Sequence, residues 1–445
     1  ALQQAATLDL PLLVVFVLTD AFPEANLRHY RFLLEGLEDT RERLAARGIR
    51  LAILHGEPVA TITAVAARAA LLLCDCGYLR IQRQWRTAVG GSVECRCVQV
   101  ESDVVVPVET AYPKEAYTAG ILRPKLHAVL EKFSVALPET PVQQPSLGLD
   151  FGLHKLIDDV PNCTLVSDER PLAGPDGLEA EMELDRTVEP VGWMHGGTTE
   201  ALQRLEEFLA TKIDHFHELR NDPSRDYLSH LSPYLHFGHI SVLYIVLQVL
   251  TMRDQPKQAD SGSAVGEGAI SEGVIGEGAA AFIEELVVRR ELAMNFAYYN
   301  SDYDSYNCLP EWAHKTLAAH EVDRRDYLYS LEQLESAETH DPHWNSAQRE
   351  MTRRGKMHGY MRMYWGKKIL EWSSRPSVAF ERALYLNNKY SLDGRDPNGF
   401  AGVAWCFGKH DRAWPERPVF GKTRYMNANG LKRKFDIEAY VGKYS

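Results

Sequence analysis

The chain has 445 residues, too many for one compact core, so its length predicts two domains. A hydrophobic content of 45% and a charged content of 25% are typical of a globular protein and argue against a disordered chain. Apolar runs stay shorter than the roughly 18 residues that a membrane-spanning helix needs, and we expect no membrane partner. The seven cysteines are an odd number without a secretory context, which favours an intracellular protein, cytoplasmic or nuclear, without a disulfide framework.

The formal net charge of −12 is distributed unevenly along the chain. Residues 351–445 hold 19 Lys+Arg and 8 Asp+Glu, a net of +11, so the other 350 residues carry −23. Six of the eight tryptophans lie between Trp312 and Trp414, overlapping the basic region. Because basic and aromatic side chains together suit phosphate contact and base stacking, the pattern favours a nucleic-acid-binding face. A basic surface that contacts only solvent is the alternative.

The first part of the chain alternates between apolar runs and helical patterns. The sequence predicts strands over residues 11–18, 50–54 and 71–74, one or two more over 98–106, and helices over 28–47, 59–70 and 83–89. Strands separated by short helices imply right-handed crossovers and a parallel, Rossmann-like sheet.

The later segments have a different character. Residues 137–190 are rich in Pro, Asp and Gly, which predicts a linker over the surface, and helical patterns dominate from Thr199 onward. Residues 260–281 carry six glycines and are expected to form a flexible loop. The C-x-C pairs, Cys74 with Cys76 and Cys95 with Cys97, leave a metal site open, with buried thiols as the default and no metal expected.

Three segments in the second half carry the most information about chemistry. They read Leu-Ser-His-Leu-Ser-Pro-Tyr-Leu-His-Phe-Gly (228–238), Lys-Met-His-Gly-Tyr-Met-Arg-Met-Tyr-Trp (356–365) and Leu-Asp-Gly-Arg-Asp-Pro-Asn-Gly (392–399). In the first segment, Ser229 and Ser232 lie at an expected helix start, where free N–H groups and the helix dipole favour a diphosphate. An ordinary capping motif is the alternative.

Together the three segments resemble the flavin-binding segments of the photolyase/cryptochrome family, and most of all those of class II cyclobutane pyrimidine dimer photolyases. The resemblance implies an α/β antenna-type domain over residues 1–136 that lacks the family's usual first strand. It further implies an interdomain linker over 137–198 and an all-α domain that binds FAD and DNA over 199–445. A second, antenna chromophore in the first domain stays open.

The resemblance also implies a set of flavin contacts. It places Ser229, His230, Leu231 and Ser232 at the FAD phosphates, the Arg362–Asp393 pair and Asn387 beside flavin N5, and Gly394, Arg395, Asp396 and Asn398 in the turn that holds the ring. An Arg held by an Asp supplies positive charge and hydrogen-bond donors without a net buried charge, although a structural ion pair between helices is the alternative. Phe216 stands where the family has a flavin-contacting Tyr.

Trp365 and Trp372 are seven residues apart and are expected to share one helix face. Core packing is the ordinary role of such residues. The resemblance assigns Trp365 as the inner and Trp344 as the outer member of a pair that reduces the flavin by photoinduced electron transfer, and leaves Trp372 as structural.

For the DNA lesion, which must be flipped out of the duplex, the resemblance implies a further set of contacts. Glu285 matches a residue that hydrogen-bonds the dimer, Trp405 and Met363 match lesion contacts, and Arg412 and Arg424 match residues that hold the gap in the duplex. Arg289 replaces an aromatic that many members carry, so stacking is one-sided or Arg289 stacks instead.

The function that this resemblance implies is light-driven repair of cyclobutane pyrimidine dimers in double-stranded DNA by a monomeric deoxyribodipyrimidine photo-lyase with reduced FAD. The alternatives are a cryptochrome-like flavin photoreceptor without repair activity and a flavin oxidoreductase without a DNA role. The expectation of no extension beyond Ser445, together with Glu285, Trp405 and the basic end, favours repair.

Overall fold

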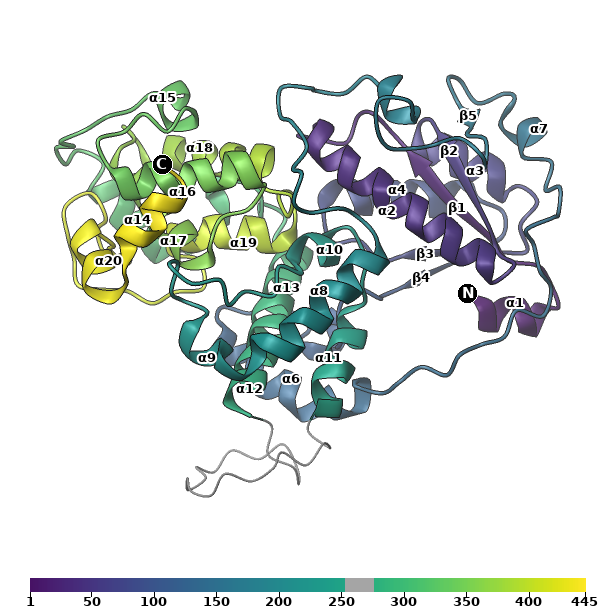
Figure 1. The fold of residues 1–445 in the computed structure, drawn as a ribbon, viewed down its shortest axis with the longest axis horizontal. Coiled ribbons are helices and arrows are strands. Elements are labelled where there is room, and N and C mark those ends of the chain that lie inside the picture. The colour runs from purple at the N-terminus through teal and green to yellow at the C-terminus, as the bar shows by residue number, and fades with distance from the viewer. Residues whose placement is uncertain (253–275) are drawn as a thin grey trace. The chain divides into compact units, whose positions relative to one another are not determined.

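The computed structural model describes residues 1–252 and 276–445 (Figure 1). The chain forms two compact units: unit 1 comprises Ala1–Asp103 and Leu137–Ala201, and unit 2 comprises Val104–Ala136 and Leu202–Ser445. Residues 260–275 of the predicted flexible loop lie outside the described residues. The last part of that loop is helical instead, because α12 already begins at Glu277.

Unit 1 contains two pairs of parallel strands. Strand β1 (Leu13–Leu18) pairs with β2 (Arg50–His55), and β3 (Leu71–Asp75) pairs with β4 (Arg96–Val100). A short strand, β5 (Thr164–Leu165), adds to β2 in the antiparallel direction. The parallel pairing is as predicted, but in the described residues the backbone hydrogen bonds form two separate sheets rather than one.

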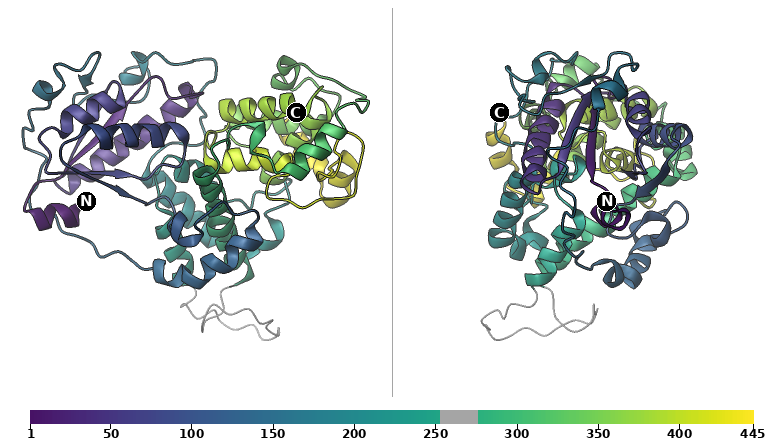
Figure 2. Two further views of the ribbon diagram at one scale, coloured as in Figure 1. Left: turned by 180° about the vertical axis from the view of Figure 1, so that it is seen from behind. Right: turned by 90° about the vertical axis from the view of Figure 1, so that its right-hand side faces the viewer.

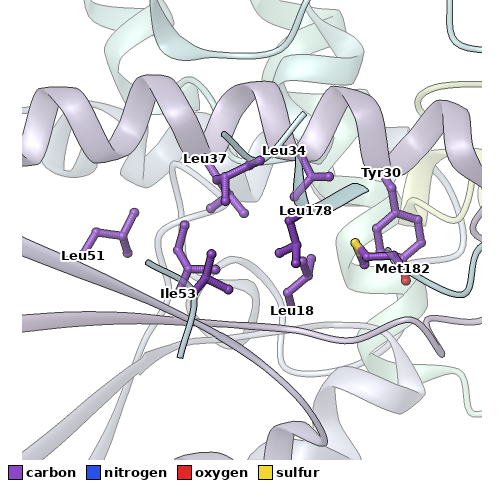
Figure 3. Packing of buried hydrophobic residues seen from close by; sticks show 10 residues of the cluster. Leu18, Tyr30, Leu34, Leu37, Leu51, Ile53, Leu178 and Met182 are labelled. Atoms are coloured by element: carbon purple, nitrogen blue, oxygen red, sulfur yellow. The ribbon is translucent and has the colours of Figure 1, made fainter. Parts of the chain in front are cut away.

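Helices α2 (Leu27–Ala46) and α3 (Pro58–Ala66) pack against the β1–β2 pair (Figure 2). The other helices of unit 1 are α1 (Leu2–Leu8), α4 (Arg80–Ser92), α7 (Leu153–Ile157) and the short 3₁₀ helix η1 (Leu178–Ala180). Helix α2 begins at a capping box in which the Asn26 side chain accepts a hydrogen bond from the backbone and the His29 ring accepts one from the N–H of Asn26. Its apolar face then packs on the sheet, as Figure 3 shows for Leu34 and Leu37 of α2 above Ile53 of β2.

The segment predicted as a linker contributes to this core. Leu172, Leu178 and Met182 are fully or almost fully buried in the same cluster as Leu34 (Figure 3). Residues 137–201 therefore belong to unit 1, because their apolar side chains bury more surface there than a solvated linker would.

Residues 104–136 belong to the helical unit instead. The backbone N–H of Val105 donates to the Glu291 carboxylate over 2.7 Å, and the N–H of Ala116 donates to the Asn295 amide oxygen over 2.7 Å. Both acceptors are buried side chains of helix α13 (Arg290–Tyr299). Of the one or two strands predicted within 98–106, the structure has one, β4, because the N–H groups of Val105 and Val106 bond to a helix side chain rather than to a strand.

Unit 2 is helical, as the pattern from Thr199 predicts. Its helices before residue 300 are α5 (Val108–Ala111), α6 (Ala119–Phe133), α8 (Thr198–Thr211, which begins at the unit boundary), η2 (Ile213–His215), α9 (Phe216–Leu219), α10 (Ser232–His236), α11 (Val242–Thr251), α12 (Glu277–Ile283), the π-helical segment η4 (Glu284–Arg289) and α13. Those that follow are η5 (Tyr306–Cys308), α14 (Glu311–Ala319), α15 (Leu331–Glu335), α16 (Pro342–Arg354), α17 (Gly359–Glu371), α18 (Pro376–Tyr390), α19 (Pro397–Cys406), α20 (Ala428–Lys434) and α21 (Ile437–Lys443). Within the described ranges, no helix has the length and apolar character needed to cross a membrane.

Candidate functional site

Many of the predicted site residues of unit 2 lie on helices α16 to α19 or on the turns that join them. Helix α17 packs against α16, α18 and α19, and α19 also packs against α13 (Figure 1). Gly355 ends α16 in a left-handed conformation (φ 68°), and its carbonyl accepts the backbone N–H of Leu392 over 2.8 Å. This bond holds the turn between α18 and α19 against the start of α17.

Arg362 of α17 and Asp393 of the α18–α19 turn form the predicted ion pair. An Nη2 atom of Arg362 lies 3.4 Å from Oδ1 of Asp393, and the side chains are 23% and 14% exposed. The Nε atom of Arg362 is buried and has no hydrogen-bond partner among the described residues. The pair thus keeps one donor available for an acceptor atom of a ligand.

Asn387, on α18, lies at the centre of the turn and is almost fully buried. Its amide nitrogen donates to Oδ1 of Asn388 over 3.3 Å, and Asn388 Oδ1 also accepts the backbone N–H of Arg395 over 3.0 Å. Arg395 has a φ of 61°, so the chain turns sharply at this point.

At two positions this turn is too tightly packed for a side chain, and glycine occupies both. A Cβ atom on Gly394 would lie 2.8–2.9 Å from backbone atoms of Ser391 and Asn387, and one on Gly399 would lie 3.1 Å from the Asn387 amide nitrogen. The predicted turn residues therefore form one compact loop around the Asn387 side chain.

Asp396 joins this loop to the segment of residues 228–238. Its Oδ2 atom lies 3.0 Å from Nδ1 of His236, and its Oδ1 atom caps α19 by accepting the backbone N–H of Asn398 over 2.8 Å. Burial disfavours the charged carboxylate, but the hydrogen bond and charge of His236 outweigh it and lower the pKa of Asp396 to about 2.

Asp396→Asn is expected to destabilise the protein by about 2 kcal/mol at neutral pH, because the depressed pKa of the native carboxylate is a stabilising term. The sign follows from a folded-state pKa below the ordinary value of 3.8: the contribution is complete above that value and is lost as pH falls toward 2. Urea unfolding from pH 6 down to pH 2.5 measures it. The matched control is Asp436→Asn, which changes an exposed helix cap, and a variant as stable as that control would contradict the assignment.

The segment that is expected to hold phosphates has a second anchored residue. His230 takes a φ of 56°, with its Nε2 atom 2.7 Å from Asp226 Oδ1 and its Nδ1 atom 2.5 Å from the Lys356 ammonium nitrogen. Burial, reinforced by the charge of Lys356, lowers the pKa of His230 to about 4, against the opposing effect of Asp226. A neutral imidazole fits this arrangement, since it accepts from Lys356 and donates to Asp226.

The other residues of that segment lie at the start of a short helix. Leu231 is the buried N-cap of α10, and Ser232 is its first residue and is exposed. Ser229 is half-buried. The predicted helix start at Ser232 is confirmed, although α10 has only five residues.

Three tryptophans of unit 2 lie in contact. Trp344 of α16 and Trp365 of α17 have ring centroids 6.4 Å apart with planes within 7° of parallel, and both are buried. The Trp344 indole N–H donates to the Trp365 carbonyl over 3.0 Å, and that of Trp365 donates to Gln348 over 2.8 Å. Trp372, the C-cap of α17, packs edge-on against Trp344 with centroids 5.6 Å apart, so Trp365 and Trp372 contact the same ring.

The predicted lesion residues Trp405, Arg412 and Arg424 form a stack of alternating rings and cations. Arg424 lies 5.5 Å from the ring centroid of Trp405 and 5.2 Å from that of Trp414, and Arg412 lies 5.0 Å from Trp414. On the α17 side, the Lys367 ammonium lies 5.6 Å from the Trp405 centroid. Met363 is half-buried on the same helix, and its carbonyl lies 4.0 Å from the Cys406 sulfur.

Glu285 and Arg289 have partners that the sequence did not indicate. Glu285, on the π-helical η4, forms an ion pair with Arg220, while its side chain stays 40% exposed. Arg289 pairs with Glu284 over 3.2 Å, and its side chain is 53% exposed. That Arg289 stacks on the lesion in place of the family's aromatic stays a prediction.

These residues occur in a chain with extensive sequence similarity to known proteins. Residues 1–145 match the DNA photolyase family. A deoxyribodipyrimidine photo-lyase from Methanothermobacter thermautotrophicus is 48% identical over 443 residues, which cover 100% of this chain and 89% of that protein. One from Oryza sativa subsp. japonica is 42% identical over 462 residues, covering 98% and 82%.

The chain belongs to the DNA photolyase family. A third relative, the deoxyribodipyrimidine photo-lyase of Potorous tridactylus, is 39% identical over 441 residues, covering 98% of this photolyase and 76% of the relative. The predicted enzyme family and the prediction of DNA photorepair are thereby confirmed.

Solved structures agree with the fold of this photolyase. A Synechocystis cryptochrome aligns with a TM-score of 0.71 at 16% identity, over 100% of this chain and 84% of that one. A class III photolyase from Agrobacterium tumefaciens aligns with a TM-score of 0.66 at 17% identity, over 100% and 83%. The predicted fold class, an α/β region followed by a helical one, is confirmed.

Several site residues of this photolyase were missed from the sequence. Lys367 is fully buried, and its ammonium has no hydrogen-bond partner among the described residues. The neighbouring Lys-Lys pair inside the apolar helix α17 was a signal for it. Arg220 and Lys356 gave no such signal, because an exposed and a buried cation look the same in a sequence.

The cysteines of unit 1 depart from the default of buried thiols. Cys74, Cys76, Cys95 and Cys97 are all half-buried, and only Cys308 and Cys406 of the seven are buried. In the described ranges, no group of three or more His, Cys, Asp or Glu side chains is arranged to hold a metal ion.

Proposed function

We propose that this photolyase is a class II deoxyribodipyrimidine photo-lyase that repairs cyclobutane pyrimidine dimers in double-stranded DNA with reduced FAD. The observation that carries the proposal is 48% identity, over the whole chain, to a protein named for that activity. The class assignment is supported by the segments 228–238, 356–365 and 392–399. Bound FAD, in its reduced form, supplies the photoexcited electron that opens the dimer.

The residues around the α18–α19 turn fit such a cofactor. The buried Nε of Arg362 lacks a partner among the described residues, which leaves a donor for an acceptor on the flavin ring. Arg362 and Asp393 would hold the ring together with Asn387, while Gly394 and Gly399 keep the turn free of side chains. The phosphates are assigned to Ser229, His230, Leu231 and Ser232, and Lys356 adds a positive charge beside His230.

In the proposed DNA site, two kinds of contact are combined. Trp405 of α19 supplies an aromatic ring to the flipped-out pyrimidine dimer, and Met363 of α17 supplies an apolar contact. Arg412 and Arg424 supply positive charge to the flanking phosphates, while the planes of Trp405 and Trp414 hold the Arg424 guanidinium. Glu285 accepts hydrogen bonds from the thymine edges once its carboxylate separates from Arg220.

Three tryptophans form the proposed electron path to the flavin. Trp365 is the inner member and Trp344 the next, since their rings are parallel and in close proximity. The family resemblance left Trp372 as structural. We include it in the proposed path because its ring contacts Trp344. Lys368 lies 5.7 Å from the Trp372 centroid, but its charge is paired with Glu371 over 2.5 Å.

The proposed function is tested by illuminating FAD-loaded, chemically reduced protein with an oligonucleotide that carries one thymine dimer. We expect recovery of thymine absorbance that depends on light and on reduced flavin. Flavin absorption bands without any repair would instead favour the cryptochrome-like photoreceptor. A protein that cannot bind FAD under these conditions would contradict both.

Glu285→Ala is expected to lower the repair yield per absorbed photon by roughly tenfold, the effect of losing one hydrogen bond to a developing charge. The dissociation constant for damaged DNA should change by less than about threefold, because the phosphate contacts remain. Fluorescence anisotropy and dimer repair measured on the same samples separate the two. Glu284→Gln is the control, since Glu284 pairs with Arg123 and Arg289 instead.

A further inference from the structure

Lys367 of helix α17 carries a charge in a fully buried place. Within residues 1–252 and 276–445, its ammonium has no hydrogen-bond partner, whereas the neighbouring Lys368 is paired with Glu371 over 2.5 Å. Helices α17 and α19 are closely packed here, since a Cβ atom on Gly366 would lie 2.6 Å from the sulfur of Cys406. Burying an unpaired ammonium costs folding free energy, so stability alone does not explain a lysine at this position.

The ammonium lies beside the residues assigned to the pyrimidine dimer. It is 5.6 Å from the ring centroid of Trp405, which is half-buried. Met363, the other proposed dimer contact, precedes Lys367 by four residues, so both side chains lie on the same face of α17. A substrate can reach the half-buried Trp405 and Met363, but it cannot touch the fully buried Lys367. Any effect of Lys367 on the dimer is therefore electrostatic and passes through Trp405.

Such an effect acts on one state of the substrate. The two bases of a pyrimidine dimer are uncharged when they bind, and they become negatively charged on accepting an electron. A base stacked at about 3.5 Å on Trp405 would lie about 9 Å from the Lys367 ammonium. At about 9 Å and an effective dielectric constant of about 20, one positive charge favours the anion by roughly 20-fold. The ammonium thus stabilises mainly the state that follows electron transfer.

We propose that Lys367 is a positioning residue for repair, whose ammonium acts across the Trp405 ring to stabilise the radical anion of the pyrimidine dimer. The inference rests on the proposed function. One electron passes to the dimer from the reduced cofactor, and it returns after the two bonds that join the bases have opened. Lys367 keeps its proton throughout, and no bond forms to its nitrogen.

The charge of Lys367 can be removed by pH as well as by substitution. Burial, reinforced by the positive charge of Arg424, lowers the pKa of Lys367 to about 8, against the opposing effects of Cys406 and Asp411. The side chain is therefore mostly an ammonium at pH 7 and mostly a neutral amine at pH 9.5. Burial raises the pKa of the Cys406 thiol to about 11, so this neighbour stays protonated over the same range.

Lys367→Met, which keeps a long side chain and removes the charge, tests the proposal in FAD-loaded, chemically reduced protein bound to an oligonucleotide with one thymine dimer. At pH 7 we expect electron transfer to the dimer, followed by the decay of flavin fluorescence, to be slower by roughly threefold, because only part of a change in driving force reaches the barrier. The unaltered protein should slow by a similar factor between pH 7 and pH 9.5, and Lys367→Met should not. Lys389→Met is the control, since that lysine is paired with Glu335 over 2.7 Å and should leave transfer unchanged.

Two further measurements separate the charge of Lys367 from its packing. The dissociation constant for dimer-containing DNA should change by less than about twofold, with an unaltered salt dependence, because a buried ammonium contacts no phosphate. The urea midpoint at pH 7 should rise in Lys367→Met, which no longer buries an unpaired charge, and fall in Lys389→Met, which loses an ion pair. Flavin content and far-ultraviolet circular dichroism show that each variant is folded.

The outcomes distinguish this proposal from the function on which it rests. If the unaltered protein does not repair the dimer under light, the proposed function itself is contradicted. If it does, and Lys367→Met transfers the electron equally fast at pH 7, Lys367 has no such role. A variant slower than the unaltered protein by the same factor at pH 7 and pH 9.5 would show an effect of packing, and a reduced salt slope would show a phosphate contact. Either result would overturn the proposal.

Discussion

Trp365→Phe is expected to abolish light-driven reduction of oxidised flavin while leaving repair by chemically pre-reduced protein close to normal. Trp365 is stacked on Trp344, and replacing its indole removes the first donor of the proposed path. Repair by pre-reduced protein does not draw electrons from the tryptophans. Flavin absorbance under steady illumination with a thiol measures the first effect, and dimer repair after chemical reduction measures the second.

Trp312→Phe serves as the matched control for this experiment. Trp312 is a tryptophan of the same unit whose indole N–H bonds to Tyr117 over 2.6 Å, outside the Trp344 cluster. Trp365→Phe also leaves the Gln348 oxygen without its partner, at a cost of about 1–3 kcal/mol, so thermal unfolding is measured alongside. Photoreduction at the normal rate in a folded Trp365→Phe protein would exclude the proposed path.

Arg424→Ala is expected to weaken binding to dimer-containing DNA by roughly tenfold and to reduce the slope of log affinity against log salt by about one. Arg424 lies near the rings of Trp405 and Trp414, which hold its positive charge in one place, so the proposed phosphate contact would need no further ordering. Anisotropy titrations across a range of salt concentrations measure both quantities.

Arg375→Ala provides the comparison, because Arg375 is an Arg of unit 2 that is 68% exposed and lies outside the ring–cation stack. Its removal should leave the salt dependence nearly unchanged. If Arg424→Ala gave the same small effect, the stack would be a structural feature of the fold and not part of the DNA site. Undamaged DNA should show a similar loss of slope, since a phosphate contact does not depend on the base.

The order of strands and helices could be predicted because it is a local property of the sequence. Strands β1 to β3 and helices α2 to α4 lie within a few residues of their expected ranges, since hydrophobic periodicity and glycine positions act over short distances. The fate of residues 104–106 could not be predicted. Their branched side chains favour a strand, but the N–H groups of Val105 and Val106 bond to Glu291, a residue more than 180 positions away.

The candidate site shows the same division. The pairing of Arg362 with Asp393 and the stacking of Trp344 with Trp365 agree with expectations that came from family resemblance. The resemblance did not indicate the Glu285–Arg220 ion pair. It left Trp372 as structural and did not indicate the contact of its ring with Trp344, because seven-residue spacing shows a shared helix face but not which rings on other helices that face meets.

The sequence by itself determined the α/β-then-helical order, the membership in the photolyase family and the residue types at the flavin and lesion segments, because motifs and periodicity are written in consecutive residues. Only the tertiary structure decided which side chains are partners. It buried Lys367 without a hydrogen-bond partner among the described residues, set Arg424 between two indoles and brought the Tyr329 hydroxyl to His340. The physical reason is that burial and hydrogen bonding depend on distances between segments far apart in the chain, which packing fixes and local sequence does not.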